Sequence, residues 1–338
     1  MADTILYDSA MRLFGDHVTP ALLADAAEGL WPGALWQAVA EAGYPDVLLD
    51  GPATMVEAAT ILRAAGHRTA PIPLAETMLA RWLCAAAQIA APDGALTIAP
   101  VEPEDRLILG SGAVTGNARH IPWGLEAEAV VVVAEGGVAR VSGGAVSWDA
   151  SDNLANEPRD HLSAAGARGE ARALPDGIDP GFVRRFGALL RAAQMAGAME
   201  AALDLSARYA TERVQFGRPI GKFQAIQQQM AVLAEHAASS WVAVENAAGA
   251  VAAARPSAGF ACAAAKIRAG EAAGKVAEIA HQVHGAMGFT DEYPLHHLTR
   301  RLWSWRDEFG NEAYWARELG RRIASAGADG LWPLITSD

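Results

Sequence analysis

Two short stretches of the chain carry residues that could grip a phosphate-bearing ligand. The first, residues 209–224, contains Arg213, whose planar fork of donors suits a diphosphate, and ends with Gln224. The second begins at Gln282 and has Gly285 three residues later. A carboxamide both donates and accepts hydrogen bonds, as a nucleotide edge requires, and glycine lets the backbone approach a ligand closely. Each stretch lies at the end of a long predicted helix, so the pattern indicates a ligand site built from helix ends.

A purely structural interpretation exists for each of these residues taken singly. Arg213 could cap the C-terminus of a helix, and Gln282 could face a neighbouring helix. The two stretches occur together in one chain, and an E-Y-P-L-x-x-x-x-R motif at Glu292–Arg300 follows the second. This combination favours the ligand site over the structural interpretation.

At these positions the chain resembles the acyl-CoA dehydrogenase family, closely over about residues 180–325 and loosely over the helical N-terminal part. The first stretch matches the family's R-x-x-F-G and F-Q elements. The second matches its Q-x-x-G-G loop, with alanine in place of the last glycine. In the family these elements contact FAD across a subunit interface. The resemblance therefore implies FAD contacts at six positions, which are Arg213, Phe216, Gln224, Gln282, Gly285 and Ala286.

The family's catalytic base is missing from this chain. The family's reaction needs a carboxylate that removes the α-proton of an acyl-CoA thioester while a hydride passes to the flavin. The resemblance places this base at Phe309 or Gly187, and neither residue accepts a proton. Glu308 is the remaining candidate base, although its arginine-rich neighbourhood favours a solvated or ion-paired carboxylate. The turn that holds the flavin ring in the family is also missing from residues 96–105.

The resemblance implies a flavoprotein oxidoreductase that acts on the CH–CH bond of a CoA thioester. Because the diphosphate contacts are kept while the base and the ring-holding turn are lost, we favour a shortened, non-catalytic subunit. Such a subunit shares FAD with a catalytic acyl-CoA dehydrogenase subunit in a hetero-oligomer. One alternative is a self-sufficient homo-oligomeric enzyme that uses Glu308. The other is a flavin-free structural or interaction subunit. Family analogy points to fatty acid or steroid side-chain degradation, and the sequence specifies no electron acceptor.

Composition excludes several other classes of protein. The 27 basic and 39 acidic residues give a net charge of −12 without any basic run, which argues against nucleic-acid or anionic-membrane binding. No run approaches the ~18 apolar residues of a membrane span, and the first twenty residues lack a signal-peptide pattern, so we predict a cytoplasmic protein. Cys84 and Cys262 lie in alanine-rich helical contexts and are predicted to be buried thiols. Histidines near the second stretch lack completing ligands, so no metal site is predicted.

We expect a fold that is mainly α-helical, with a small β part in the middle of the chain. We expect a helical N-terminal domain over residues 1–92, a reduced β-domain over 93–177 and a C-terminal four-helix bundle over 178–338. Apolar residues at three-and-four spacing predict four N-terminal helices, at Ala21–Gly29, Leu35–Ala42, Ala53–Ala65 and Leu74–Ile89. Short β-branched runs predict strands at Ala95–Ala99, Arg106–Leu109, Ala129–Ala134 and Gly137–Val141. Three segments of roughly thirty residues each predict the long helices of the bundle.

Overall fold

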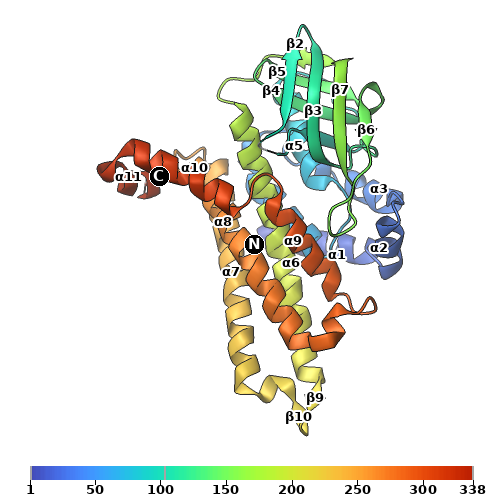
Figure 1. Cartoon of the computed structure of the whole chain (residues 1–338), viewed down its shortest axis with the longest axis vertical. Helices are drawn as coiled ribbons and strands as arrows, with labels where there is room; N and C mark the ends of the chain where they lie inside the picture. Colours follow the sequence, from blue (N-terminus) through green and yellow to red (C-terminus); the bar gives the residue numbers. More distant parts are fainter. Residues whose placement is uncertain (1, 103, 337–338) are drawn as a thin grey trace.

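The computed structural model describes residues 2–102 and 104–336, and it is mainly helical, as predicted (Figure 1). Helices come first, strands follow, and long helices complete the chain. The division into three domains stays a prediction. The N-terminal helices are α1 (Ala2–His17), α2 (Pro20–Ala27), α3 (Gly33–Glu41), α4 (Met55–His67) and α5 (Leu74–Ala86).

Local signals explain where these helices begin and what they bury. Thr19 caps α2, because its hydroxyl oxygen accepts a hydrogen bond from the backbone N–H of Leu22 at 3.2 Å, and Pro20 occupies the first helical position. The sequence patterns predicted α2 to α5 but not α1. Ala10 and Phe14 of α1 lie four residues apart and are completely buried, so this short apolar stripe docks the helix.

Among its described residues, the middle part contains eight strands in two four-stranded sheets. One sheet has the order β1-β4-β5-β8, with β1 parallel to β4, and the other has the antiparallel order β2-β3-β7-β6. The expectation of four short strands was therefore incomplete. The sequence patterns did not predict β7, because it contains many polar residues and its exposed and buried positions alternate only partly. The strands are β1 (Leu96–Ala99), β2 (Arg106–Gly110), β3 (Ala113–Pro122), β4 (Ala129–Ala134), β5 (Gly137–Ser142), β6 (Ser147–Asp149), β7 (Arg159–Arg168) and β8 (Glu170–Arg172).

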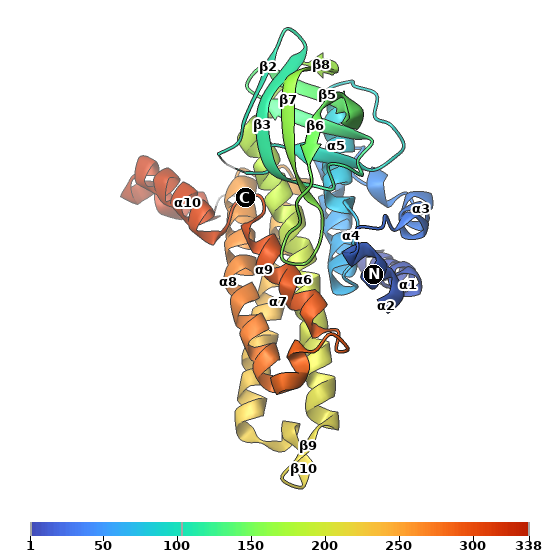
Figure 2. The ribbon, with the colours of Figure 1, turned by 45° about the vertical axis from the view of Figure 1, so that its right-hand side comes forward.

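Three long helices run side by side from the sheets to a small hairpin at the far end (Figures 1 and 2). The hairpin, made by β9 (Val214–Gln215) and β10 (Arg218–Pro219), joins α6 to α7. Helix α9 packs on α6 and α8, and α10 extends sideways from the sheet end of α8. The helices of this part are α6 (Pro180–Glu212), α7 (Gln224–Ala252), α8 (Ala258–His284), α9 (Leu295–Asp307), α10 (Glu312–Ala326) and α11 (Leu331–Thr336).

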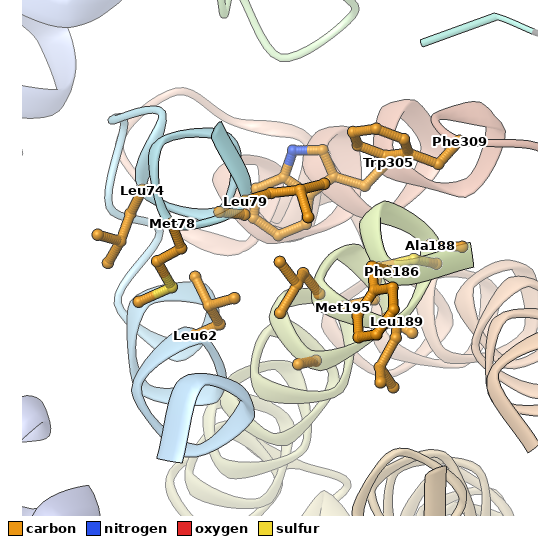
Figure 3. Packing of buried hydrophobic residues seen from close by; sticks show 14 of the residues in the cluster. Leu62, Leu74, Met78, Leu79, Phe186, Ala188, Leu189, Met195, Trp305 and Phe309 are labelled. Atoms are coloured by element: carbon orange, nitrogen blue, oxygen red, sulfur yellow. The ribbon is translucent and has the colours of Figure 1, made fainter. Parts of the chain in front are cut away.

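Glycine allows α4 and α6 to cross at close range. A Cβ atom placed on Gly66 of α4 would overlap the carbonyl of Gln194, and one on Gly197 of α6 would overlap the carbonyl of Arg63. Side chains from α4, α5, α6 and α9 meet above this crossing. Figure 3 shows this packing, with labelled residues that include Leu62, Met78, Leu79, Leu189, Met195, Trp305 and Phe309.

Three further observations concern the described part of the chain. Cys84 and Cys262 are buried free thiols, as predicted, and burial raises the pKa of Cys84 to about 11. Within residues 2–102 and 104–336, no group of three histidine, cysteine or carboxylate side chains is arranged to hold a metal ion. None of the helices in the same ranges combines the length and apolarity needed to cross a bilayer.

Candidate functional site

Four of the six predicted FAD contacts line one cleft. This cleft has a volume of about 420 Å³ and lies between the end of α6 and the turn after α8. Its lining includes Arg213, Gln282, Gly285 and Ala286, which come from segments about seventy residues apart in the sequence. The tertiary fold thus brings the two predicted stretches together. We call this site the hairpin cleft.

The backbone around Arg213 is fixed while its side chain remains exposed. Its N–H donates to the carbonyl of Tyr209 at 2.9 Å, and its own carbonyl accepts from the N–H of Ile220 at 2.8 Å. The β9–β10 hairpin therefore holds the residue directly after the last turn of α6. Arg213 is exposed, and no described residue forms a hydrogen bond or ion pair with its guanidinium. The five donors of this group remain available to an anion.

The opposite wall of the hairpin cleft is set by His284. Its Nδ1 donates to the carbonyl of Ala280 at 2.7 Å, which leaves Nε2 to accept from the hydroxyl of Tyr293 at 3.0 Å. Burial lowers the pKa of His284, so the ring is neutral at physiological pH, consistent with this pair of roles. The ring of Tyr209 lies 4.5 Å from the His284 ring, centroid to centroid. Helix α8 consequently ends in a fixed position.

Gly285 gives the cleft an open floor of backbone. It ends α8 with a φ of +58°, in the left-handed region that glycine adopts most readily, and begins the 3₁₀ turn Gly285–Phe289. No described atom lies within 4 Å of the position where a Cβ would stand. Gln282, one turn earlier on α8, is exposed beside it. A ligand can therefore approach both the glycine backbone and the carboxamide.

Phe216 and Gln224 lie outside the lining of the hairpin cleft. Phe216 sits in the turn of the hairpin and is 92% exposed, and Gln224 is the exposed first residue of α7. Both belong to the same end of the helical bundle as Arg213. The structure thus separates these two predicted contacts from the other four.

The two family positions for a catalytic base are packed against each other. Phe309 is 2% exposed, and a Cβ placed on Gly187 would overlap its ring. The buried Lys266 fixes the backbone around Phe309, because its Nζ donates to the carbonyl of Gly310 at 2.9 Å and to that of Arg306 at 2.5 Å. The space next to Gly187 is therefore filled by an aromatic ring.

Glu308, the candidate base, is buried between two arginines. Arg159 of β7 donates from Nε to one carboxylate oxygen at 2.7 Å, and Nη2 of Arg191 on α6 lies 2.7 Å from the other. Arg191 also pairs with Glu76 of α5. A carboxylate that is only 5% exposed and held by two cations is not free to approach a substrate. The geometry supports the ion-paired interpretation of Glu308 and not the solvated one.

The buried ion pairs continue from Arg159 through Glu157 to α9. Glu157 accepts from Arg159 at 3.0 Å and from Arg301 of α9 at 2.9 Å, and the indole N–H of Trp305 donates to it at 2.9 Å. Burial alone would raise the pKa of Glu157, but the attraction of Arg301 and Arg159 outweighs it and lowers the pKa to about 2. Three carboxylates thus balance three guanidinium groups inside the protein. We call these six residues the buried ion cluster: Glu76, Glu157, Arg159, Arg191, Arg301 and Glu308.

The sequence analysis did not identify this cluster apart from Glu308. Its members carry no motif, and the contacts of Arg191 with Glu76 and of Arg159 with Glu308 join residues 115 and 149 positions apart. One signal was available in the sequence. Arg191 interrupts the apolar stripe of α6, where a charged residue needs a buried partner.

Known proteins similar to this chain share its fold over nearly the whole length. Residues 185–324 match the family model of the acyl-CoA dehydrogenase C-terminal domain. Acyl-CoA dehydrogenase IpdE2 of Mycobacterium tuberculosis is 29% identical over 308 residues, which cover 88% of this chain and 89% of that protein. The ChsE4–ChsE5 complex from Mycobacterium tuberculosis matches with a TM-score of 0.85 at 25% identity, covering 97% of this chain and 98% of that chain. The Tcur3481–Tcur3483 steroid ACAD matches with a TM-score of 0.86 at 25% identity, covering 96% and 98%. Residues 185–324 are thus similar to the C-terminal domain of acyl-CoA dehydrogenases, and the chain as a whole is similar to members of that family.

Proposed function

We propose that this chain is the base-less subunit of a hetero-oligomeric acyl-CoA dehydrogenase and helps hold an FAD whose flavin ring lies in a partner subunit. One observation supports this proposal most directly. The hairpin cleft is open and carries an exposed guanidinium, whereas the family's base positions, Gly187 and Phe309, fill each other's space.

The donors of the hairpin cleft fit the dinucleotide part of FAD. Arg213 would bind the diphosphate with charge-assisted hydrogen bonds, Gln282 would bind a polar edge, and Gly285 would allow close contact with its backbone. When bound, FAD supplies the acceptor for the hydride that leaves the β-carbon of an acyl-CoA thioester. This chain's own part is to grip the cofactor, while the partner subunit supplies the carboxylate base.

The buried ion cluster supports the assignment of the flavin ring to a partner subunit. Glu308 and Phe309 follow α9, where the family places its base, and both are buried. Arg159, Arg191 and Glu76 extend the same cluster to β7, α6 and α5. Opening a ring site there would break several buried ion pairs, each of which is costly to break. The alternative of a self-sufficient enzyme with Glu308 as base is therefore disfavoured.

Relatives suggest the class of acyl group and of partner. The structures at 25% identity are a steroid ACAD and a complex of two named chains, ChsE4 and ChsE5. By analogy we propose a CoA thioester with a bulky acyl group, such as a steroid side chain, and a catalytic acyl-CoA dehydrogenase as the partner. A cytoplasmic location remains part of this proposal.

Co-expression with a catalytic acyl-CoA dehydrogenase subunit tests the proposal. We expect a colourless chain when it is expressed alone, and a yellow mixed assembly that contains FAD. Arg213→Ala should lower the flavin content of that assembly by about tenfold under dilute conditions, since a charge-assisted contact to a diphosphate is lost. Arg208→Ala, an exposed arginine near the end of α6 but outside the hairpin cleft, is the matched control and should have no effect. A fully loaded homotetramer, or equal effects of the two variants, would contradict the shared site.

A further inference from the structure

A further cleft opens where α1, α4, α6 and the start of α9 meet. It has a volume of about 630 Å³, and side chains of all four helices contribute to its lining. This volume is within the range of pockets that hold small organic ligands. The cleft shares no lining residue with the hairpin cleft, so the two are separate sites. We call it the α1–α6 cleft.

Much of the lining of the α1–α6 cleft is apolar. Met11 of α1 and Leu205 of α6 are half-buried and pack against the hydrophobic core, and Leu298 of α9 is 5% exposed. Ala201, Leu205 and Arg208 are spaced by four and three residues, so they lie on one face of α6. The burial of these apolar side chains by an apolar ligand would favour binding.

Two arginines line the same cleft. Arg68 follows the last residue of α4, and its Nη2 lies 3.4 Å from the position of a Cβ placed on Gly15 of α1. Arg208 extends the apolar face of α6. Both arginines are exposed, and neither guanidinium has a hydrogen bond or ion pair with another described residue. Their N–H donors remain available to an anion.

One carboxylate among the described residues of this lining opposes the two arginines. Oδ2 of Asp204 lies 3.3 Å from Nε2 of His67. Burial lowers the pKa of His67, so its ring is neutral at physiological pH and donates to Asp204 without cancelling the charge of the carboxylate. Burial also lowers the pKa of His297 in this lining, to about 4, so that ring is neutral as well. The described lining therefore carries two positive charges and one negative charge.

Tyr7 adds a neutral donor to the α1–α6 cleft. It lines the cleft from α1, and burial raises the pKa of its hydroxyl to about 12, so the hydroxyl keeps its proton. Phenol and guanidinium groups both donate to carboxylate oxygens. An excess of one positive charge beside an apolar wall suits a ligand that has a single carboxylate on an apolar body.

We propose that the α1–α6 cleft binds an amphiphilic carboxylate, with its carboxylate at Arg68 and Arg208 and its apolar body on Met11, Leu205 and Leu298. A flexible alkyl chain and a rigid polycyclic body share this chemistry, and the test below separates them. The inference goes beyond the proposed function, because it requires neither FAD nor a partner subunit.

Calorimetric titration of the full chain with four probes tests this proposal. Decanoate has a flexible apolar chain and cholate has a rigid ring system, whereas decanol lacks the charge and acetate lacks the apolar body. We expect decanoate or cholate to bind, and the tighter of the two identifies the kind of apolar body. Decanol and acetate should each bind about tenfold more weakly or less, since each loses one of the two contributions.

Substitutions of the charged side chains test the placement of the carboxylate. Arg68→Ala and Arg208→Ala, which change different helices, should each weaken binding of the tighter probe by about tenfold. Asp204→Asn should strengthen it, because the substitution removes the opposing charge while the amide oxygen still accepts from His67. Arg12→Ala is the matched control, because Arg12 is an exposed residue of α1 that does not line the cleft.

Three results would overturn the inference. They are a lack of binding of both decanoate and cholate, binding of decanol as tight as that of the carboxylates, and equal loss in Arg12→Ala and Arg68→Ala. The flavin content of the mixed assembly separates this inference from the proposed function. Arg68→Ala should leave the flavin content unchanged, and Arg213→Ala should leave carboxylate binding unchanged.

Discussion

At the residue scale, an arginine and a glutamate illustrate two uses of charge in this chain. Arg213 is exposed at a pinned backbone position, so its guanidinium can bind a ligand without first losing a protein partner. Glu308 is buried and held by Arg159 and Arg191, so its charge is already committed. Sequence position alone did not distinguish them, since each lies next to a family motif. Burial and partners decide which of the two can act on a ligand.

Replacing Glu308 should affect stability rather than chemistry. Glu308→Gln removes a carboxylate that pairs with both Arg159 and Arg191, so two carboxylates remain to balance three buried guanidinium groups. We expect this excess positive charge to lower the free energy of unfolding by about 3 kcal/mol or more. Under the proposed function the base belongs to the partner subunit, so thioester-dependent dye reduction by the mixed assembly should stay unchanged. Denaturant unfolding and the dye assay measure the two effects. Asp307→Asn, at the exposed neighbouring residue, is the control. Lost dye reduction with unchanged stability would instead identify Glu308 as the base.

Lys266 predicts a pH dependence of stability. Burial lowers its pKa from 10.5 to about 7 in the folded chain, while the unfolded chain keeps the ordinary value. Between pH 7 and 10.5 the unfolded state therefore binds more protons, and this lysine makes the folded state more stable as pH rises through that window. We expect the free energy of unfolding of the unchanged chain, measured relative to that of Lys266→Met, to rise between pH 6.5 and 9.5. A difference that is constant with pH would contradict the perturbed pKa.

At the element scale, close helix crossings depend on glycine. Gly66→Ala would place a methyl group against the carbonyl of Gln194 where α4 crosses α6, and we expect a loss of about 1–3 kcal/mol or more in the free energy of unfolding. Gly249→Ala in α7 is the matched control. A Cβ there would have no described atom within 4 Å, and alanine favours the helix by about 0.5–1 kcal/mol. Equal effects of the two substitutions on denaturant midpoints would argue against a tight crossing.

The elements also show which parts of the structure follow from local sequence. The long helices α6, α7 and α8 were predictable because their apolar residues and helix formers continue for about thirty positions. Helix α1 and strand β7 were missed because a short stripe or a polar alternation gives a weak local signal. The hairpin cleft was predictable in part, since Arg213 and Gln282 lie in local motifs. The buried ion cluster was not, because only tertiary contacts bring its members together.

At the scale of the whole molecule, the proposed cofactor contacts and the buried ion cluster lie in different parts of the chain. The β9–β10 hairpin lies at the end of the bundle far from the sheets (Figure 2), and the hairpin cleft is beside it. The buried ion cluster instead joins residues of α5, α6, β7 and α9. Phe309 closes the base position next to this cluster. A pair made of this chain and a catalytic subunit should therefore have only one complete flavin site.

Flavin stoichiometry tests this asymmetry. We expect one FAD for each pair of unlike chains, as measured by flavin absorbance against the mass of the native assembly. Phe309→Glu restores a carboxylate at the family's base position, but it should add neither a second flavin nor a second active site, because Arg159, Arg191 and Glu308 still occupy the neighbouring interior. The catalytic subunit purified alone serves as the reference for flavin content per ring site. Two flavins per pair would show that this chain accommodates a ring of its own, and the buried ion cluster would then have to open when FAD binds.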